Sequence, residues 1–258
     1  MSMTNPAAST LLLSAVTAMA AGLMGCYALM RRMTLAGDAL SHVALPGIGL
    51  ALILRISPLA GALAALLAGT ALIWLLERRT RISTETVIGV VFSAALAVGA
   101  LLTTGHELMD ALFGAPAALT RWELGVGLAG AALVIAFAIL ARDRLIITLV
   151  SPEIALTSGI NVPRMNLLFL VAFAVTVALG LRYLGVLLMG SLVIIPAATA
   201  RRLAHDLNGT FAASVAVAVF STVSGTYVAL ALHRESGPVI VTIAAACFLL
   251  AAVYQPSR

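Results

Sequence analysis

An aspartate and a histidine stand together in a strongly apolar part of the chain, within the sequence AGDALSHVALPGIG at residues 36–49. Asp38 and His42 are four residues apart, so on a helix their side chains are one turn apart and face the same way. A carboxylate oxygen and an imidazole nitrogen suit zinc, manganese or ferrous iron. The same spacing suits a hydrogen-bonded pair or a helix cap, so a metal contact and a structural pair stay open as alternatives.

Two prolines are expected to disturb the helices that carry them. Pro46 lacks the N–H that would bond the carbonyl of His42, which predicts a bend and a free carbonyl oxygen at that histidine. Pro196 lies in a short apolar segment, residues 184–200, which we therefore expect to be a broken or half span.

The composition identifies the surroundings of these residues as a membrane. The chain has 258 residues, of which 62% are hydrophobic and 10% charged, and its mean hydropathy is +1.12. Apolar runs of about 20 residues are long enough to cross a hydrocarbon core as helices, and ten-residue stretches of alternating polarity, typical of a barrel, are missing from the sequence. We predict an all-α, polytopic transmembrane bundle of eight or nine helices, forming one domain over residues 1–258. The predicted spans are residues 9–30, 35–54, 57–76, 84–104, 121–141, 164–181, 184–200, 207–232 and 237–254.

The basic residues predict the orientation of the bundle. The chain contains no lysine, so all 15 basic residues are arginines. If successive loops alternate sides, eleven arginines fall on one side and four on the other, and the arginine-rich side is expected to be cytoplasmic. The net charge of +5 therefore indicates topology rather than binding to nucleic acid.

The longest predicted cytoplasmic connection spans residues 142–164. Polar residues, proline, glycine and asparagine interrupt its apolar stretch, which favours one short amphipathic helix between two spans. A Walker-type GxxxxGKS segment does not occur in the sequence, so the chain is not expected to hydrolyse ATP itself.

Other acidic and histidine residues carry less weight. His106, Glu107 and Asp110 fall in a predicted outer connection, where they form either an acidic mouth that attracts cations or a solvated loop. They do not make an HExxH metalloprotease site, because Asp110 stands where the second histidine belongs. Glu85 opens a predicted helix, where an acid is favourable to the helix dipole, and we interpret it as structural.

Several ordered motifs, from about residue 25 to residue 254, resemble the membrane permeases of metal-ion ABC transporters, bacterial importers of zinc, manganese and iron. The motifs that carry this resemblance are RRMTLAGDALSHVALPGIGLA at 31–51, STETVIGVVFSAALAVG at 83–99, ALFG at 111–114, SPEIALTSGINV at 151–162, YLGVLLMGSLVIIPAATARRL at 183–203 and SGPVIVTIAAACFLLA at 236–251.

The resemblance implies a multi-pass permease of the bacterial inner membrane that works with other subunits and is not itself an enzyme. These are a second permease subunit, most simply a homodimer partner, two cytoplasmic ABC ATPase subunits and an extracytoplasmic metal-binding protein. The transported ion is Zn²⁺ or Mn²⁺, with Fe²⁺ also open, and no cofactor is held permanently. Asp38 and His42 are then expected to line the path and contact the metal, and a two-fold axis would bring two of each together.

The resemblance also assigns a role to the predicted cytoplasmic segment, about residues 145–162. Its Glu153, Ala155 and Gly159 fit the acid, small and glycine pattern of a coupling helix that docks on an ATPase, and an ordinary interfacial helix is the alternative. For the whole chain, the alternative function is an ion-coupled secondary metal transporter that needs no ATPase. The sequence does not choose among the three metals, because aspartate and histidine accept all of them.

Overall fold

The computed structural model describes residues 6–33, 36–80, 82–102 and 120–254, and their regular structure is entirely helical. Eight of the helical stretches are long and apolar enough to cross a membrane. These observations confirm the predicted all-α transmembrane bundle. The helices are α1 (Pro6–Met30), α2 (Ala36–Ile53), α3 (Pro58–Thr80), α4 (Thr84–Leu102), α6 (Arg121–Leu140), α7 (Arg142–Val150), α8 (Pro152–Thr157), α9 (Val162–Leu203), α10 (Leu207–Leu232) and α11 (Ser236–Tyr254).

Local capping explains where several helices begin. The Thr120 side chain accepts a hydrogen bond from the backbone N–H of Glu123, and the Glu123 carboxylate accepts one from the N–H of Thr120, so a complete capping box starts α6. Asn161 and Asp206 cap α9 and α10 through their side-chain oxygens. These polar caps satisfy N–H groups that would otherwise be unpaired at the end of an apolar helix.

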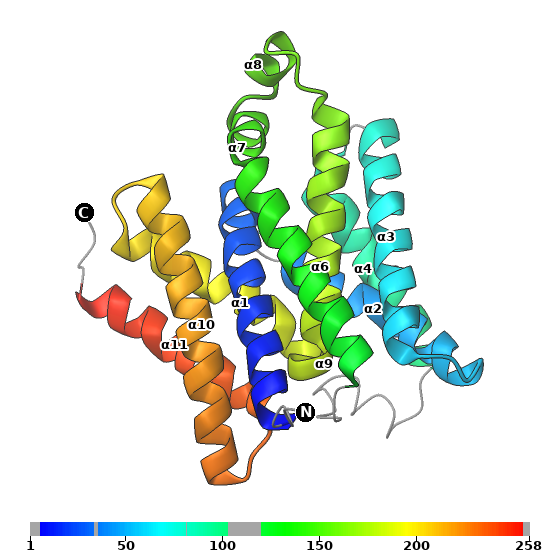
Figure 1. The fold of residues 1–258 in the computed structure, drawn as a ribbon. Coiled ribbons are helices and arrows are strands. Elements are labelled where there is room, and N and C mark those ends of the chain that lie inside the picture. The colour runs from blue at the N-terminus through cyan, green and yellow to red at the C-terminus, as the bar shows by residue number, and fades with distance from the viewer. Residues whose placement is uncertain (1–5, 34–35, 81, 103–119, 255–258) are drawn as a thin grey trace.

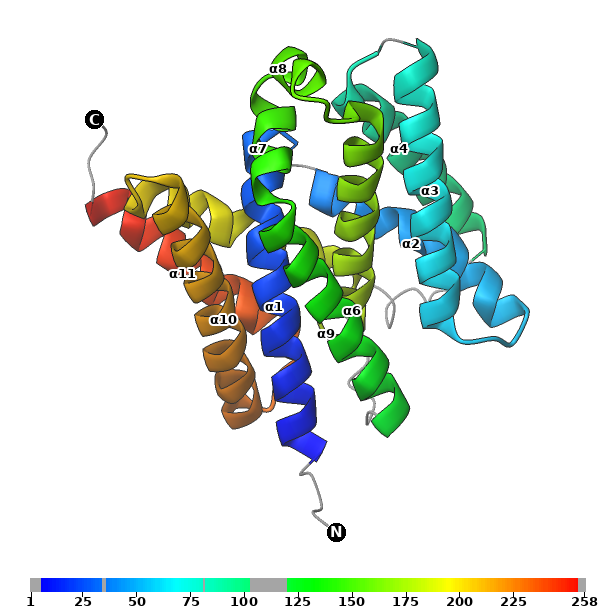
Figure 2. The same cartoon turned by 45° about the horizontal axis from the view of Figure 1, so that its top comes forward.

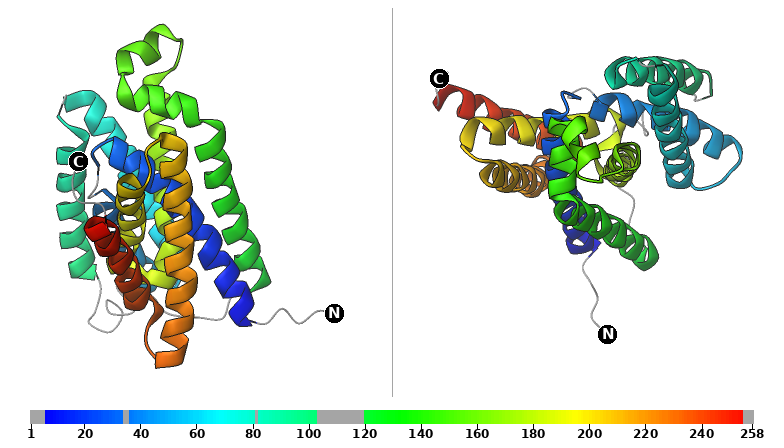
Figure 3. Two further views of the ribbon diagram at one scale, coloured as in Figure 1. Left: turned by 90° about the vertical axis from the view of Figure 1, so that its left-hand side faces the viewer. Right: turned by 90° about the horizontal axis from the view of Figure 1, so that it is seen from above.

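The helices form a bundle around α1, α2 and α9 (Figures 1 and 3). α2 packs against α3, α4 and α9, while α1 packs against α6, α9 and α10. Viewed from above, α3 and α4 lie on one side of α1 and α9, and α10 and α11 lie on the other (Figure 3, right). α2 is therefore an interior helix of the bundle.

One end of the bundle carries the short helices α7 and α8 (Figure 1). The C-terminal ends of α1 and α3 and the connection from α9 to α10 point toward the same end. Arg78 and Arg79 lie in the last turn of α3, and Arg201 and Arg202 lie in the last turn of α9. The arrangement thus collects at one end the arginines that the sequence assigns to the cytoplasmic side.

The helix α9 consists of two arms. Gly185, with φ 71° and ψ 174°, is the non-helical residue inside it; this conformation is open almost only to glycine. The first arm, Val162–Leu181, is long enough to span a membrane, and the second arm, residues 186–203, turns back from its end and runs obliquely toward α10 (Figure 1, yellow). The described part of the chain therefore contains eight full-length spans and one shorter returning helical arm, and the break lies at Gly185 rather than at Pro196.

The connection after α6 also differs from its prediction. It contains two short helices, α7 and α8, where the sequence pattern favours one. Ser151 separates them: it ends α7 and caps α8 by accepting a hydrogen bond from the N–H of Ile154. Figure 2 shows the pair projecting beyond the spans and leading into α9.

Candidate metal-translocation site

Asp38 and His42 lie on α2 with their side chains on one face, as the four-residue spacing predicts. The Oδ1 atom of Asp38 is 3.9 Å from the Nε2 atom of His42. This distance exceeds that of a hydrogen bond, so the two groups face each other without being bonded. The Asp38 side chain is 48% exposed and the His42 side chain 12% exposed. The carboxylate is therefore accessible to an ion, while the ring is held by packing.

The His42 ring is fixed by an aromatic contact rather than by hydrogen bonds. It meets the Phe92 ring of α4 edge-on, with the ring centroids 5.4 Å apart. Its Nδ1 atom is buried and has no hydrogen-bond partner among the residues that the structure describes. A buried polar atom left without a partner is uncommon in proteins and calls for an explanation such as a ligand or a bound water.

A cavity of about 190 Å³ lies between the first turns of α2 and α4. Asp38 lines it from α2, and Glu85 and Phe92 line it from α4. Glu85, which the sequence suggests to be only a first-turn acid, thus shares a cavity with the candidate metal residue. Only the packing of α2 against α4 places both residues on one cavity; their positions in the sequence give no such signal. Met33, Ala36, Ala39, Ile88 and Gly89 complete the lining.

The part of one copy that the structure describes offers fewer candidate ligands than a metal site commonly takes. Across residues 6–33, 36–80, 82–102 and 120–254, no three His, Cys, Asp or Glu side chains lie close enough together to hold a metal ion. Asp38 and His42 provide two donors, whereas zinc in proteins commonly takes four ligands. The geometry suits a transient contact or a site shared between two copies.

A buried ion pair lies at the arginine-rich end of the same region. Arg31, just after α1, places Nη2 3.2 Å from Oε1 of Glu77 on α3, and Thr84 at the start of α4 donates to the same oxygen at 2.6 Å. Burial lowers the pKa of the Arg31 guanidinium, and the Glu77 carboxylate opposes that shift. The guanidinium also lies over the Phe169 ring of α9, 5.6 Å from its centroid. This network joins four helices and was not foreseen from the sequence.

The predicted coupling residues occupy three different environments in and after α8. Glu153 is exposed and Ala155 is fully buried. Gly159 has φ +74° and ends α8, where its N–H bonds the carbonyl of Leu156 and the next N–H bonds that of Ala155. Ala155 therefore packs inward, and Gly159 makes the turn from α8 into α9. The side chains that α8 exposes include two large apolar ones, Ile154 and Leu156.

The predicted outer vestibule cannot be placed. His106, Glu107 and Asp110 lie outside the described residues.

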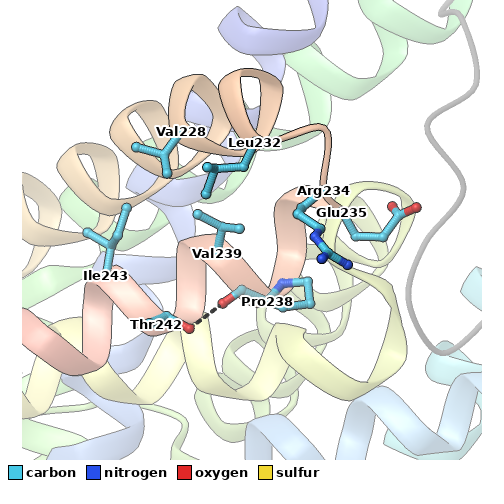
Figure 4. A pocket seen from close by; sticks show the side chains of 8 residues that line it. All are labelled: Val228, Leu232, Arg234, Glu235, Pro238, Val239, Thr242 and Ile243. Atoms are coloured by element: carbon cyan, nitrogen blue, oxygen red, sulfur yellow. Dashed lines mark hydrogen bonds between the residues drawn. The ribbon is translucent and has the colours of Figure 1, made fainter.

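A larger hollow, of about 650 Å³, lies between α10 and α11 and away from α2 (Figure 4). Val228, Val239 and Ile243 line its apolar part, and Arg234 and Glu235 lie at the turn between the two helices. Thr242 uses its hydroxyl to bond the carbonyl of Pro238 within its own helix, at 2.8 Å. One acid beside an arginine is a poor ligand set for a metal, so the smaller cavity beside Asp38 is the better candidate.

These features define a multi-pass helical membrane protein of the transport class, with a polar pair on an interior helix and two short helices that project at one end. The chain belongs to the ABC 3 transport family, which matches residues 3–255.

Relatives and a solved structure agree over most of the chain. The sequence is 32% identical to the high-affinity zinc uptake system membrane protein ZnuB of Haemophilus influenzae, covering 88% of this chain and 89% of that protein. It is 30% identical to the manganese transport system membrane protein MntC of Halalkalibacterium halodurans, over 92% and 83% of the two chains. The fold is similar to the structure titled "PsaBC from Streptococcus pneumoniae in complex with Fab", with a TM-score of 0.83, 27% identity and coverage of 96% and 91%.

The family membership confirms the predicted class of protein. The chain is a multi-pass membrane permease of a bacterial ABC importer and not itself the ATPase. The alternative of an ion-coupled secondary transporter is set aside by the same match.

Proposed function

We propose that the chain moves a divalent transition metal ion across the bacterial inner membrane by alternating access, with Asp38 and His42 as the residues that contact the ion. The main support for this proposal is the arrangement of Asp38 and His42 on α2. The two groups face each other at 3.9 Å without a hydrogen bond, and the accessible carboxylate lines a cavity. Ionisable groups on interior membrane helices usually serve a transport path, because their burial is costly.

The incomplete ligand set supports a paired permease. Two copies related by a two-fold axis along the path would bring together two aspartates and two histidines. Four such ligands hold zinc or manganese, and their number drops when the two halves separate. Binding and release of the ion then follow from a change in the spacing of the copies.

The energy for this change comes from partner subunits in our proposal. Two ABC ATPases dock at the arginine-rich end, with the segment around α8 as the coupling element, and an extracytoplasmic metal-binding protein delivers the ion. The exposed Ile154 and Leu156 support this assignment, because exposed apolar side chains on a projecting helix are typical of a protein contact. Glu153, also exposed on α8, is the charged member of this contact.

The identity of the ion stays open between zinc and manganese, with iron as a third candidate. Carboxylate and imidazole ligands accept all three, and relatives named for zinc and for manganese are about equally similar to this chain. Uptake of each ion by the reconstituted complex decides among them.

The experiment for the site compares Asp38→Ala and His42→Ala with the wild type. Each variant is reconstituted into proteoliposomes with its ATPase and binding protein, and uptake of radioactive zinc and manganese is measured per folded permease. We expect both variants to assemble with the ATPase and to show uptake at the level of empty vesicles.

His205→Ala is the matched control for the histidine, because His205 is exposed and lies between α9 and α10, away from α2. Its uptake should equal that of the wild type. Wild-type uptake by Asp38→Ala and His42→Ala would refute the proposed site, while the family assignment would stand.

A further inference from the structure

The second arm of α9 is held in place by contacts that leave no room for a side chain. A Cβ atom added to Gly180 on the first arm would lie 2.0 Å from the sulfur of Met189 on the second arm, a fully buried side chain that would have to move. A Cβ added to Gly25 of α1 would lie 2.0 Å from the carbonyl oxygen of Val193. Real Cβ atoms do not approach other atoms so closely, because interiors are close-packed. The arm is thus wedged against both its own first arm and α1.

The same arm touches the backbone of the candidate metal residue. A Cβ added to Gly190 would lie 2.6 Å from both the Cα and the N atom of Asp38, and 2.8 Å from its Cβ. The atoms that would clash belong to the backbone of α2 and to the root of the side chain, so no change of rotamer relieves the contact. A side chain at position 190 must push α2 away at Asp38 itself.

We propose that Gly190 is a positioning residue for transport: its missing side chain lets the second arm of α9 seat the backbone of Asp38 where its carboxylate, together with His42, holds the metal. Metal ligands must lie within about 0.2 Å of their ideal distances. A clash that requires a larger shift of the Asp38 backbone would therefore change metal handling before it unfolds the bundle. The inference rests on the proposed role of Asp38.

The bend at Gly185 links the contact between Gly190 and Asp38 to the position of the second arm of α9. The second arm follows the only non-helical residue described within α9, so its position is set by its contacts with the first arm, α1 and α2 rather than by a continuous helix. Movement of the arm would carry the contact at Asp38 with it. The returning arm thus couples the position of the metal carboxylate to the packing of α1 and α9.

The test compares Gly190→Ala with Gly225→Ala. A Cβ at Gly225 would lie 2.6 Å from Ile240 Cγ1 and 2.7 Å from its Cα, so it crowds the α10–α11 contact to the same degree without touching α2. Uptake of radioactive zinc and of radioactive manganese is measured in proteoliposomes with the ATPase and binding protein, per folded permease counted by size-exclusion chromatography.

We expect Gly190→Ala to lower uptake per folded permease about tenfold or more and to change the ratio of zinc to manganese uptake, because the ligand geometry has moved. Gly225→Ala should lower at most the amount of folded protein and leave the ratio unchanged. The proposal is overturned if Gly190→Ala matches Gly225→Ala in both uptake per folded permease and ion ratio.

Two further variants separate the possible failures. If Gly190→Ala does not fold, Gly37→Val takes its place. A Cβ at Gly37 would lie at an ordinary contact distance of 3.4 Å from the Gly190 Cα, so the two added methyl groups of valine are what crowd the same contact; an unchanged ion ratio there would also overturn the proposal. Asp38→Ala is measured in parallel. Wild-type metal uptake by Asp38→Ala refutes the proposed function itself. If Asp38→Ala shows no metal uptake while Gly190→Ala takes up metal like the wild type, only the role of Gly190 is refuted.

Discussion

The interior helix α2 and the peripheral helix α11 differ in burial and in hydropathy, and the relation between the two quantities is the reverse of that in a water-soluble protein. In the most apolar stretch of α2, 61% of the residues are buried and the mean hydropathy is 1.4. In that of α11, 22% of the residues are buried and the mean hydropathy is 2.2. The more buried helix is thus the less apolar one. A bilayer demands apolar side chains on the outer surface, whereas the interior of the bundle can hold small residues and satisfied or functional polar ones.

The comparison explains why the chemistry sits on α2. Association of membrane helices depends on close packing and on buried polar contacts rather than on a hydrophobic driving force. α2 provides both: its Gly47 meets Gly61 of α3 backbone to backbone, and it carries Asp38 and His42. α11 also packs closely, with Ile240 against Gly225 of α10, but it carries no acidic residue and no histidine, and its exposed positions include large apolar side chains such as Leu249 and Leu250.

The largest effect should follow from filling the contact between α2 and α3. A Cβ at Gly61 would lie 2.2 Å from the carbonyl oxygen of Gly47, so Gly61→Val must force the two helices apart. We expect a loss of about 3 kcal/mol or more. The measurement is thermal unfolding in detergent. Unfolding is detected by the reaction of Cys26, which is buried in the folded protein, with a thiol-reactive dye.

Gly125→Val is the matched control on the peripheral helix α6, where an added Cβ meets nothing within 4 Å. Its unfolding temperature should stay close to that of the wild type. Equal losses in both variants would show that the crossing of α2 and α3 does not hold the interior together.

The next effect concerns the buried pair Arg31 and Glu77. Arg31→Met removes the partner of a carboxylate that is only 21% exposed, which we expect to cost about 3 kcal/mol or somewhat less. The double variant Arg31→Met, Glu77→Met should recover most of that loss, because no charge is left unpaired. A double-mutant cycle on the unfolding temperature measures the coupling. Additive losses would contradict a direct interaction.

A smaller effect is expected at the turn after α8. Gly159→Ala places a side chain at φ +74°, which costs about 1 kcal/mol. If this segment couples to the ATPase, stimulation of ATP hydrolysis by the loaded binding protein should fall more than stability does. Gly159→Asn is the control, since asparagine tolerates the left-handed conformation better. Normal stimulation in Gly159→Ala would count against coupling through this turn.

The smallest effect is expected on the outer face. Leu133 of α6 is 71% exposed, so Leu133→Ala should change stability by less than about 0.5 kcal/mol. Leu66→Ala, at a fully buried leucine of α3, should cost about 2–5 kcal/mol. Both are measured by the same unfolding assay. A Leu133→Ala loss as large as that of Leu66→Ala would show that the outer face of α6 is covered by another protein surface.

Much of the fold could be predicted because the bilayer imposes a length on every span. The predicted span 207–232 coincides with α10, and the predicted spans 84–104 and 121–141 differ from α4 and α6 only at their ends. The returning arm of α9 was harder to predict, since Pro196 is a stronger helix breaker by residue type than Gly185. The break falls at Gly185, whose φ of 71° and ψ of 174° are open almost only to glycine, whereas Pro196 lies inside a helical turn of the second arm.

The candidate site could be predicted only in part. Asp38 and His42 are one helical turn apart, so their shared face follows from helix geometry alone. Glu85 and Gly190 belong to helices distant in the sequence. Nothing in their local pattern indicates that Glu85 lines the cavity beside Asp38 or that Gly190 packs against its backbone. Ala155 fits a coupling pattern by residue type, yet its complete burial shows that it supports α8 from inside.

The membrane class, the lengths of the spans, the asymmetry of the arginines and the spacing of Asp38 and His42 can all be predicted without a structure, because each depends on local composition and on the fixed thickness of a bilayer. The tertiary structure decided which helices surround α2, and it placed Gly190 against the Asp38 backbone and Glu85 in the cavity beside it. Those outcomes depend on contacts between distant segments, where steric fit to within a few tenths of an ångström selects one packing.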